Sequence, residues 1–419
     1  MAIDCLDCRR RLVRLFSSLI GRRLSLCELQ GAPHKRRIMH SEEIIAAAEA
    51  QTGLSADPKG AFHTGLDLLT AALRASDQVP AEGRAMLRFI WTRNLANKLK
   101  VEDYHRRHPE LADSPVARPV FIMGMPRTGT TLLSNLLAAD PARRCMLNWE
   151  SNDPVPPPAS WAAIHNDPRC LAAKARDAQL IAENPEAASR HFEPADAPTE
   201  CTFIHGHEFM AAMLEALTPA PEYARWLEQE ADLTIAYAYE KRFMQVLQHH
   251  TGGTWSVKMP SHALFVQSLV KVFPDARIIW THRDPYKSTA SLLSLIHSTH
   301  ETFGVMGTRQ YVRNRYVGQA VAHMRNAWNF ERENPQQVTH VHYAQLMVDP
   351  IGVMRSVYAA LGDEFTPEAE LAMRRYLADN PQGKHGSHSY GLDQFGLQVS
   401  DLEPHFADYV AHFGVAMEQ

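Results

Sequence analysis

The sequence contains no apolar run long enough to cross a bilayer and no N-x-[ST] acceptor for N-glycosylation. A membrane-spanning helix needs about 20 consecutive apolar residues. The chain also lacks a strong excess of one charge, because 43 Lys and Arg residues face 47 Asp and Glu residues. These absences argue against an integral membrane protein, a secreted glycoprotein and a protein whose overall charge attracts nucleic acid.

Cysteine is scarce and scattered. Cys5 and Cys8 form a CxxC pair, but no second pair follows at zinc-binding spacing, and no strand precedes the pair as a redox fold would require. We therefore expect free thiols in a reducing, cytoplasmic compartment. The close histidine pairs lack a third ligand at a recognised spacing, so the sequence predicts no metal site. These pairs are His205 with His207, His249 with His250, and His340 with His342.

The first 38 residues differ from the rest, with eight Arg and one Lys against three acids. The stretch 9-RRRLVRLFSSLIGRRLSL-26 is compatible with a basic amphipathic helix on a membrane surface. We favour a disordered basic tail or an upstream start codon, because Met39 precedes 41-SEEIIAAAEAQTG-53, a well-capped helix start. Arg14 and Arg22 interrupt the apolar part, which argues against a signal peptide.

The remaining chain predicts an α/β fold. Residues 39–117 show helical spacing of apolar positions, and short β-rich runs then alternate with amphipathic helices. Such alternation is typical of a three-layer, P-loop-type parallel sheet flanked by helices. The expected strands are 120–123, 145–149, 254–258, 277–281 and 338–343.

Two further segments complete this organisation. A break of about a hundred residues, roughly 154–250, opens with 154-PVPPP-158 and is too long for a plain connection. We expect a helical insertion that caps the sheet edge of a core domain spanning 118–350. Residues 351–419 should add C-terminal helices and a loop that completes the site.

The segment from Gly124 to Thr131 reads as a phosphate-binding loop between a buried strand and a leucine-rich helix. It matches G-x-x-x-x-G-[K]-[ST] except that Thr130 replaces the lysine. Backbone amides and a helix N-terminus attract phosphate groups there, and Arg127 adds a permanent cation. The missing lysine argues against ATP with magnesium as the ligand.

Polar side chains follow three other expected strands. Lys258 ends the third, Arg283 ends the fourth with Ser291 eight residues on, and Glu150 follows the second. Because parallel strands end at one edge of a sheet, these groups should face a common ligand. Two alternatives stay open: Lys258 is a solvated strand-end lysine, or a carboxylate after the second strand merely neutralises Arg127. Asp284 and Pro285 look like the start of a helix instead of ligands.

This arrangement resembles the sulfotransferase family, in the broad bacterial-type branch related to tyrosylprotein sulfotransferases. The stretch 126-PRTGTTLL-133 is similar to the family's P-[KR]-[ST]-G-[ST]-[ST] loop, and 283-RDPYKSTAS-291 is similar to its 3′-phosphate motif. Lys258 in 257-VKMPSHAL-264 and Tyr343 in 343-YAQLMVDP-350 also match. The resemblance spans roughly residues 118–350.

The resemblance implies in-line transfer of a sulfuryl group from 3′-phosphoadenosine 5′-phosphosulfate (PAPS) to an acceptor hydroxyl, without metal. A sulfuryl group carries less charge than a γ-phosphoryl group, so neither a metal clamp nor the usual lysine is needed. The implied catalytic residues are Arg127 and Lys258, which stabilise developing charge, and Glu150, the general base, with Asp153 nearby. The implied donor-binding residues are Arg127, Thr128, Gly129, Thr130 and Thr131 at the 5′-phosphosulfate, Arg283 and Ser291 at the 3′-phosphate, Tyr343 near adenine, and Lys384 with His385 in a late loop.

Two other functions stay open from the residues. A P-loop kinase or NTPase would need a magnesium-holding aspartate at a strand end, and Asp284, preceded by an arginine, is a poor candidate. A non-catalytic nucleotide-binding protein would have little use for Arg127, Lys258 and Glu150 together. We expect the acceptor to be a small molecule or lipid with a hydroxyl group. The helices that would enclose an apolar acceptor can equally be ordinary packing helices.

Overall fold

The computed structural model describes residues 39–183, 193–381 and 391–418. The expected basic tail, residues 1–38, lies outside this range, as do Lys384 and His385. None of the helices built from the described residues is long and apolar enough to cross a membrane.

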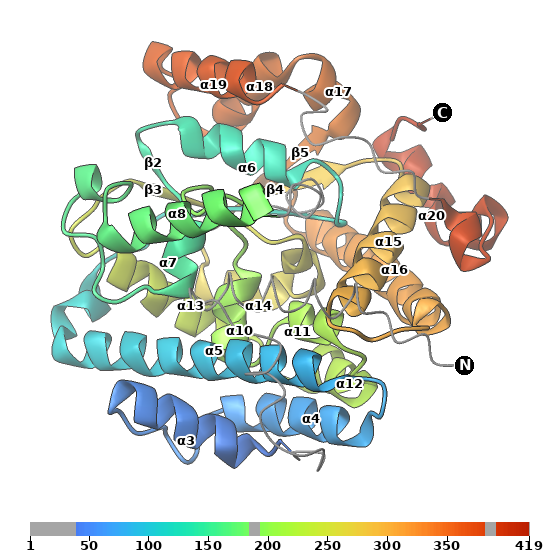
Figure 1. The fold of residues 1–419 in the computed structure, drawn as a ribbon. Helices are drawn as coiled ribbons and strands as arrows, with labels where there is room; N and C mark the ends of the chain where they lie inside the picture. The colour runs from blue at the N-terminus through green and yellow to red at the C-terminus, as the bar shows by residue number, and fades with distance from the viewer. Residues whose placement is uncertain (1–38, 184–192, 382–390, 419) are drawn as a thin grey trace.

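A five-stranded parallel sheet lies at the centre of the molecule (Figure 1). The strand order is β2-β3-β1-β4-β5, so β1 is the middle strand and pairs with both β3 and β4. Helices cover both faces, which confirms the predicted three-layer α/β fold. The strands are β1 (Val120–Gly124), β2 (Arg143–Arg144), β3 (Thr254–Lys258), β4 (Arg277–His282) and β5 (Val338–His342).

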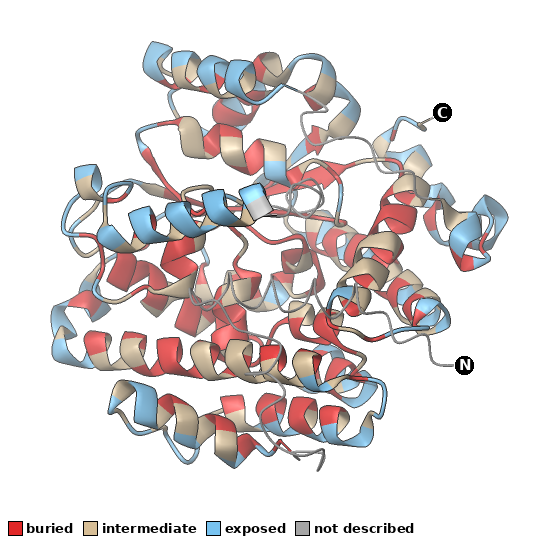
Figure 2. Cartoon of the chain, in the orientation of Figure 1, coloured by how far each residue is buried: buried red, intermediate tan, exposed pale blue. Residues whose placement is uncertain are grey.

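The sheet is buried on both faces because alternate residues of each strand pack into different cores. Val120 and Ile122 join a core formed with the helices around α6, whereas Phe121 and Met123 join a larger core on the opposite face. Figure 2 shows the strands buried between helices whose outward surfaces are exposed. The near-continuous apolar runs of the sequence follow from this double burial.

The helices fall into three groups along the chain. An N-terminal layer lies on the outside of the larger core, far from α18 and α19 (Figure 1). It consists of α3 (Ser41–Thr52), α4 (Phe62–Ala75) and α5 (Ala81–Arg107). The insertion after β2 contributes α7 (Asn148–Asn152), α8 (Pro168–Glu183), α10 (Thr202–His207), α11 (Ala212–Leu217), α12 (Pro221–Gln229) and α13 (Thr234–Leu247). The others are α6 (Thr130–Ala139), α14 (Val266–Val272), α15 (Pro285–Thr302), α16 (Arg309–Glu333), α17 (Tyr343–Val348), α18 (Pro350–Leu361), α19 (Pro367–Asp379) and α20 (Val399–Phe413).

The second strand differs from the prediction of residues 145–149. The observed strand is only Arg143–Arg144, and Asn148–Asn152 forms the short helix α7. The Glu150 carboxylate accepts a hydrogen bond from the Leu147 N–H at 3.0 Å, which begins the helix. A local side-chain bond of this kind outweighs the β propensity of a short apolar run.

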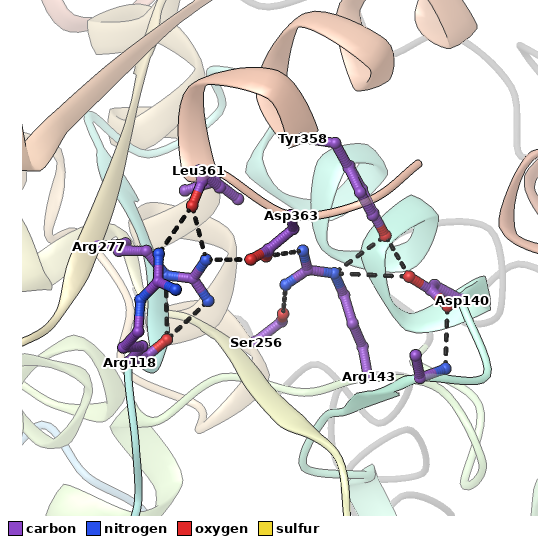
Figure 3. Close-up of polar contacts among 9 residues, drawn as sticks. Arg118, Asp140, Arg143, Ser256, Arg277, Tyr358, Leu361 and Asp363 are labelled. Atoms are coloured by element: carbon purple, nitrogen blue, oxygen red, sulfur yellow. Dashed lines mark hydrogen bonds and ion pairs between the residues drawn. The ribbon is translucent and has the colours of Figure 1, made fainter. Parts of the chain in front are cut away.

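An ionic network joins the start of the sheet to the end of α18 (Figure 3). Asp363 accepts hydrogen bonds from Arg143 of β2 and from Arg277 of β4, each at 2.6 Å. The Leu361 carbonyl accepts from Arg277 and Arg118, each at 3.0 Å. The carboxylate therefore fixes two non-neighbouring strands and the C-terminal helices in one arrangement.

Replacing Asp363 with Asn should lower the free energy of unfolding by about 2 kcal/mol, because nearly buried Arg143 would lose its charged partner. Burial alone would raise the pKa of Asp363, but the hydrogen bonds and charges of Arg277 and Arg143 hold it below the ordinary 3.8. A carboxyl group whose pKa is lowered by folding stabilises the fold at pH values above its unfolded-state pKa. This stabilisation is lost as the pH falls. Urea unfolding of wild type and variant should therefore converge at acidic pH. Glu370→Gln, which also removes two arginine pairs but on the surface of α19, is the matched control and should cost less.

Candidate active site

The loop after β1 wraps its backbone around the N-terminus of α6. Gly124 has φ 152°, and Gly129, the residue before the helix, has φ 88°. A Cβ on Gly124 would lie 2.5 Å from the Thr281 hydroxyl oxygen, so only glycine fits against β4. Arg127 also has a positive φ of 70°. Strain at a non-glycine residue is retained where surrounding structure fixes it, and such positions cluster at functional sites.

Thr128 fastens this loop to the neighbouring strand. Its hydroxyl is buried, donates to the Met125 carbonyl at 2.7 Å and lies 2.5 Å from the Thr281 hydroxyl of β4. Thr130 and Thr131 are the first residues of α6, the former buried and the latter exposed. Their amides lie in the first turn of the helix, where backbone N–H groups lack intrahelical acceptors and favour anions.

The loop and the β4 motif, which are far apart in sequence, form one cluster. The Arg127 side chain donates from Nε to the Ser291 hydroxyl at 3.1 Å, and Arg283 donates to the Arg127 carbonyl at 2.7 Å. Ser291 is nearly buried in α15. Two cationic side chains and a hydroxyl therefore gather at the carboxyl edge of β1 and β4, as the sequence predicts.

Arg283 is held in a forked ion pair with a residue that the sequence does not single out. Its Nε and Nη2 donate to the two carboxylate oxygens of Glu418 at 2.5 and 2.7 Å. The guanidinium lies 4.2 Å from the centre of the Tyr343 ring. Glu418 is in turn fixed by its own N–H, which donates to Asp284. Arg283 is thus oriented to grip a forked oxyanion, and a carboxylate of the protein occupies that position.

Asp284 caps α15 as expected and is not a ligand in this arrangement. Its Oδ1 accepts from the N–H groups of Tyr286 and Lys287, and its Oδ2 accepts from Glu418. Both carboxylate oxygens are therefore committed to backbone donors. This aligns the start of α15, and with it Ser291.

Lys258 ends β3 and is almost fully buried, with 1% of its side chain exposed. Its ammonium donates to Glu200 at 2.7 Å, and Glu193 lies 4.0 Å away. Burial alone would lower the pKa of Lys258, but the charges of Glu200 and Glu193 raise it above 10.5. The lysine is therefore a permanent cation at neutral pH. The alternative of a solvated strand-end lysine is wrong, and no sequence pattern pointed to Glu200.

Glu150 lies in a different environment from the one expected of a general base. It is fully buried and forms a forked ion pair with Arg144, one contact of which is 3.0 Å. Its remaining bond is the one from the Leu147 N–H. Asp153 pairs with Lys100 at 3.2 Å. Neither carboxylate neutralises Arg127, so that alternative is also wrong.

These features define a class before any comparison is made: a parallel α/β fold with a glycine-containing loop after β1 and cationic side chains gathered where β1 and β4 end. Comparison with known proteins gives the particular family. Residues 119–367 match the model of the sulfotransferase family, and the chain belongs to that family and is a sulfotransferase.

Two solved structures of sulfotransferases share the fold of this chain and match most of its length. STF9 from Mycobacterium avium is 37% identical with a TM-score of 0.86, over 92% of this chain and 99% of that one. STF1 from Mycobacterium tuberculosis H37Rv is 27% identical with a TM-score of 0.79, over 89% of this chain and 100% of that one. The omega-hydroxy-beta-dihydromenaquinone-9 sulfotransferases Stf3 of Mycobacterium bovis and Mycobacterium tuberculosis are each 26% identical over 313 residues, 71% of this chain and 75% of theirs.

Gly129→Ala should disrupt the loop through both backbone and packing. Its φ is unfavourable for alanine, and the new Cβ would lie 2.8 Å from the Tyr343 ring. We expect a loss of about 1–3 kcal/mol in unfolding free energy and a larger fractional loss of transfer activity, measured on the folded enzyme. The control is Gly318→Ala, an exposed position of α16 where no described atom beyond the local helix backbone lies within 4 Å of the new Cβ. It should be neutral or stabilising; equal effects of the two changes would contradict this account.

Proposed function

We propose that the enzyme transfers the sulfuryl group of PAPS to a hydroxyl of a small-molecule or lipid acceptor by in-line displacement. The observation that carries the proposal is the joining of Arg127, Ser291 and Arg283 at one sheet edge, beside the start of α6. A nucleotide with anionic groups at both the 5′ and 3′ positions matches two adjacent sets of donors. Guanidinium groups are suited to such forked oxyanions.

The donor-binding roles follow from where each group lies. Backbone N–H groups of Thr128, Gly129, Thr130 and Thr131 would hold the 5′-phosphosulfate, as in other helix N-terminal anion sites. The Thr128 hydroxyl is committed to Met125 and Thr281, so its contribution is its amide. Arg283 would hold the 3′-phosphate after leaving Glu418, with Ser291 beside it. Tyr343, which stacks on Arg283, would border the adenine. Lys384 stays a prediction of the sequence.

Charge stabilisation in the transfer step falls to Arg127 and Lys258. Negative charge develops on the oxygen that bridges sulfur and the 5′-phosphate as that bond breaks, and fixed cations lower its energy in a site of low dielectric. Lys258 suits this role because its neighbouring carboxylates keep it protonated. No metal is needed to neutralise the transferred group, which is the expectation drawn from the altered loop.

We propose Glu200, in place of Glu150, as the general base. Glu150 would have to leave Arg144 and move out of a fully buried position before it could accept a proton. The Glu200 side chain is 29% exposed and lies next to Lys258. A base must be within hydrogen-bond reach of the acceptor hydroxyl, and a partly exposed carboxylate beside the reacting groups meets that need. Glu150 instead anchors the start of α7.

We propose a lipid alcohol as the acceptor class, because relatives at 26% identity are named omega-hydroxy-beta-dihydromenaquinone-9 sulfotransferases. The insertion that follows β2 supplies buried apolar residues on the side of the larger core. We also propose a cytoplasmic location, which is supported by the lack of disulfides at the described cysteines Cys145, Cys170 and Cys201. The acceptor itself is to be found by screening hydroxylated lipids and small metabolites with PAPS.

A kinase-like function is disfavoured by the state of Asp284. A magnesium-holding aspartate must offer free carboxylate oxygens, and both oxygens of Asp284 accept backbone N–H groups. A binding-only protein is disfavoured because a buried ion pair such as Lys258–Glu200 costs desolvation free energy and has no evident use in a pocket that only binds a nucleotide.

Thermal unfolding with nucleotides tests the donor directly. 3′,5′-ADP, the desulfated donor, should raise the melting temperature, whereas AMP and ATP with magnesium should not at equal concentration. Arg283→Ala should weaken 3′,5′-ADP binding about 10- to 100-fold. Glu418→Gln, which removes the competing carboxylate, should tighten it about two- to fivefold. Selective stabilisation by ATP with magnesium would instead support the kinase alternative.

Arg127→Ala separates chemistry from folding in the same assays. We expect turnover of PAPS to fall about 10²- to 10³-fold, as for loss of a charge-stabilising donor, with little change in stability because Arg127 is exposed. Unchanged turnover in a folded Arg127→Ala enzyme would remove this residue from the mechanism.

The identity of the base is tested by a pair of conservative variants. Glu200→Gln should lower kcat about 10²- to 10⁴-fold, since the base is lost. Glu150→Gln should cost about 3 kcal/mol of stability by leaving Arg144 buried without an anion, but the folded fraction should keep its kcat. The opposite pattern in the two variants would return the base role to Glu150.

A further inference from the structure

Behind the Glu200–Lys258 pair lies a fully buried cluster of metal-ligating side chains. One ligand atom from each of Cys201, Glu240 and His262 lies within 4.8 Å of the others. His205 adds a fourth group, since its Nε2 lies 2.8 Å from the Glu240 carboxylate. All four side chains are buried, with at most about 1% of each residue exposed. They come from the start and body of α10, from α13 and from the short helix η3 (Pro260–Leu264).

Two polar atoms of this cluster have no hydrogen-bond partner among the residues that the structure describes. The Glu240 Oε1 is one, and the His262 Nε2 is the other. Nδ1 of His262 is engaged by the Tyr237 hydroxyl at 2.9 Å, so Nε2 is the nitrogen left for a ligand. A buried carboxylate oxygen and a buried imidazole nitrogen without partners each cost free energy. Nearly all such groups in proteins are satisfied, and an exception calls for an explanation.

A single divalent cation would satisfy both atoms at once. Thiolate, imidazole and carboxylate together are ligands of zinc, whereas magnesium and calcium select oxygen. One thiolate and one carboxylate also balance a charge of 2+, so the occupied site would be neutral within the core. Without a metal, His205 satisfies one Glu240 carboxylate oxygen and the Cys201 thiol can donate to the carboxylate, but His262 Nε2 still has no partner among the described residues.

We propose that Cys201, His205, Glu240 and His262 bind a structural Zn²⁺ ion that positions the Glu200–Lys258 pair. Cys201 directly follows Glu200, and its N–H donates to the Lys258 carbonyl at 3.0 Å. His262 lies four residues after Lys258. An ion bound by both therefore cross-links the two segments that carry the pair. It takes no part in the transfer step itself, and it revises the expectation of no metal, which rested on ligand spacing along the chain.

Metal analysis of the full-length enzyme tests the proposal. Cys5→Ser, Cys8→Ser and Cys27→Ser should first be combined, so that metal bound by these N-terminal thiols is not counted as metal in the buried cluster. In this background, protein purified without chelator should contain stoichiometric zinc by mass spectrometry. Cobalt exchanged for zinc should give a thiolate-to-cobalt charge-transfer band. Absence of zinc, together with no change in melting temperature on adding Zn²⁺ to chelator-treated protein, would overturn the proposal.

Variants then assign the ligands. Cys201→Ser and His262→Gln should each weaken zinc binding by more than about 100-fold, beyond the loss caused by removing only a supporting hydrogen bond. The control is His249→Ala, because His108, Glu110 and His249 form a second, more exposed group that could hold a cation. Zinc retained in His249→Ala supports the buried site; zinc lost there, or kept in Cys201→Ser, contradicts it. If a variant fails to fold, the thiolate-to-cobalt band of the enzyme that retains Cys201 still tests whether a thiolate binds the metal.

A positioning role has its own readout. Removing zinc should lower kcat of the folded enzyme while leaving the affinity for 3′,5′-ADP within about twofold, because Arg283 directly follows β4 and Ser291 lies in α15, away from the zinc ligands. Zinc loss with an unchanged kcat would refute the positioning role. Loss of nucleotide selectivity in the metal-loaded enzyme would instead count against the proposed donor, so the two failures are distinguishable.

Discussion

The contact between Gly124 and Thr281 is the constraint on which the site depends. It brings the loop after β1 against β4 so closely that no side chain fits between them. The Thr128 hydroxyl then hydrogen-bonds to the Thr281 hydroxyl, which fixes the loop beside the end of β4, where Arg283 and then α15 follow. Arg127, Ser291 and Arg283 meet as a result of this one junction. The rest of the sheet, including the Asp363 network at its opposite end, holds the two strands in the register that the junction requires.

The three cations discussed above are each paired with a carboxylate of the protein. Lys258 is held by Glu200 and Glu193, Arg283 by Glu418, and Arg144 by Glu150. The first two pairs are partly exposed on the acidic side, so the cation can exchange its partner for a ligand. The third is fully buried and serves only the fold. Accessibility of the carboxylate therefore separates the two pairs that we propose act in the site from the one that is structural.

Much of the fold, and the meeting of Arg127, Arg283 and Ser291, could be predicted from local patterns. The loop, the cap at Asp284 and the spacing of Arg283 and Ser291 are encoded within short stretches, and the strands around them were recognisable as apolar runs. The second strand was misplaced because two residues carry no periodicity, and a side-chain bond to Leu147 turns the next residues into a helix. The ion pairs of Glu200 with Lys258 and of Glu418 with Arg283 could not be found, since nothing in the sequence near these carboxylates marks their partners. Likewise, Cys201, Glu240 and His262 come together only through the packing of α10, α13 and η3.

The forked bond between Arg283 and Glu418 means that the proposed nucleotide meets a site already filled by an internal counter-ion. Entry of the 3′-phosphate must exchange one anion for another, so the guanidinium is never left bare in either state. The net binding free energy is then the difference between the Arg283–phosphate pair and the Arg283–Glu418 pair. This lowers the affinity for the desulfated nucleotide and favours its release. Glu418 would return to Arg283 as product leaves, and each turnover would end with the enzyme neutralised by its own chain.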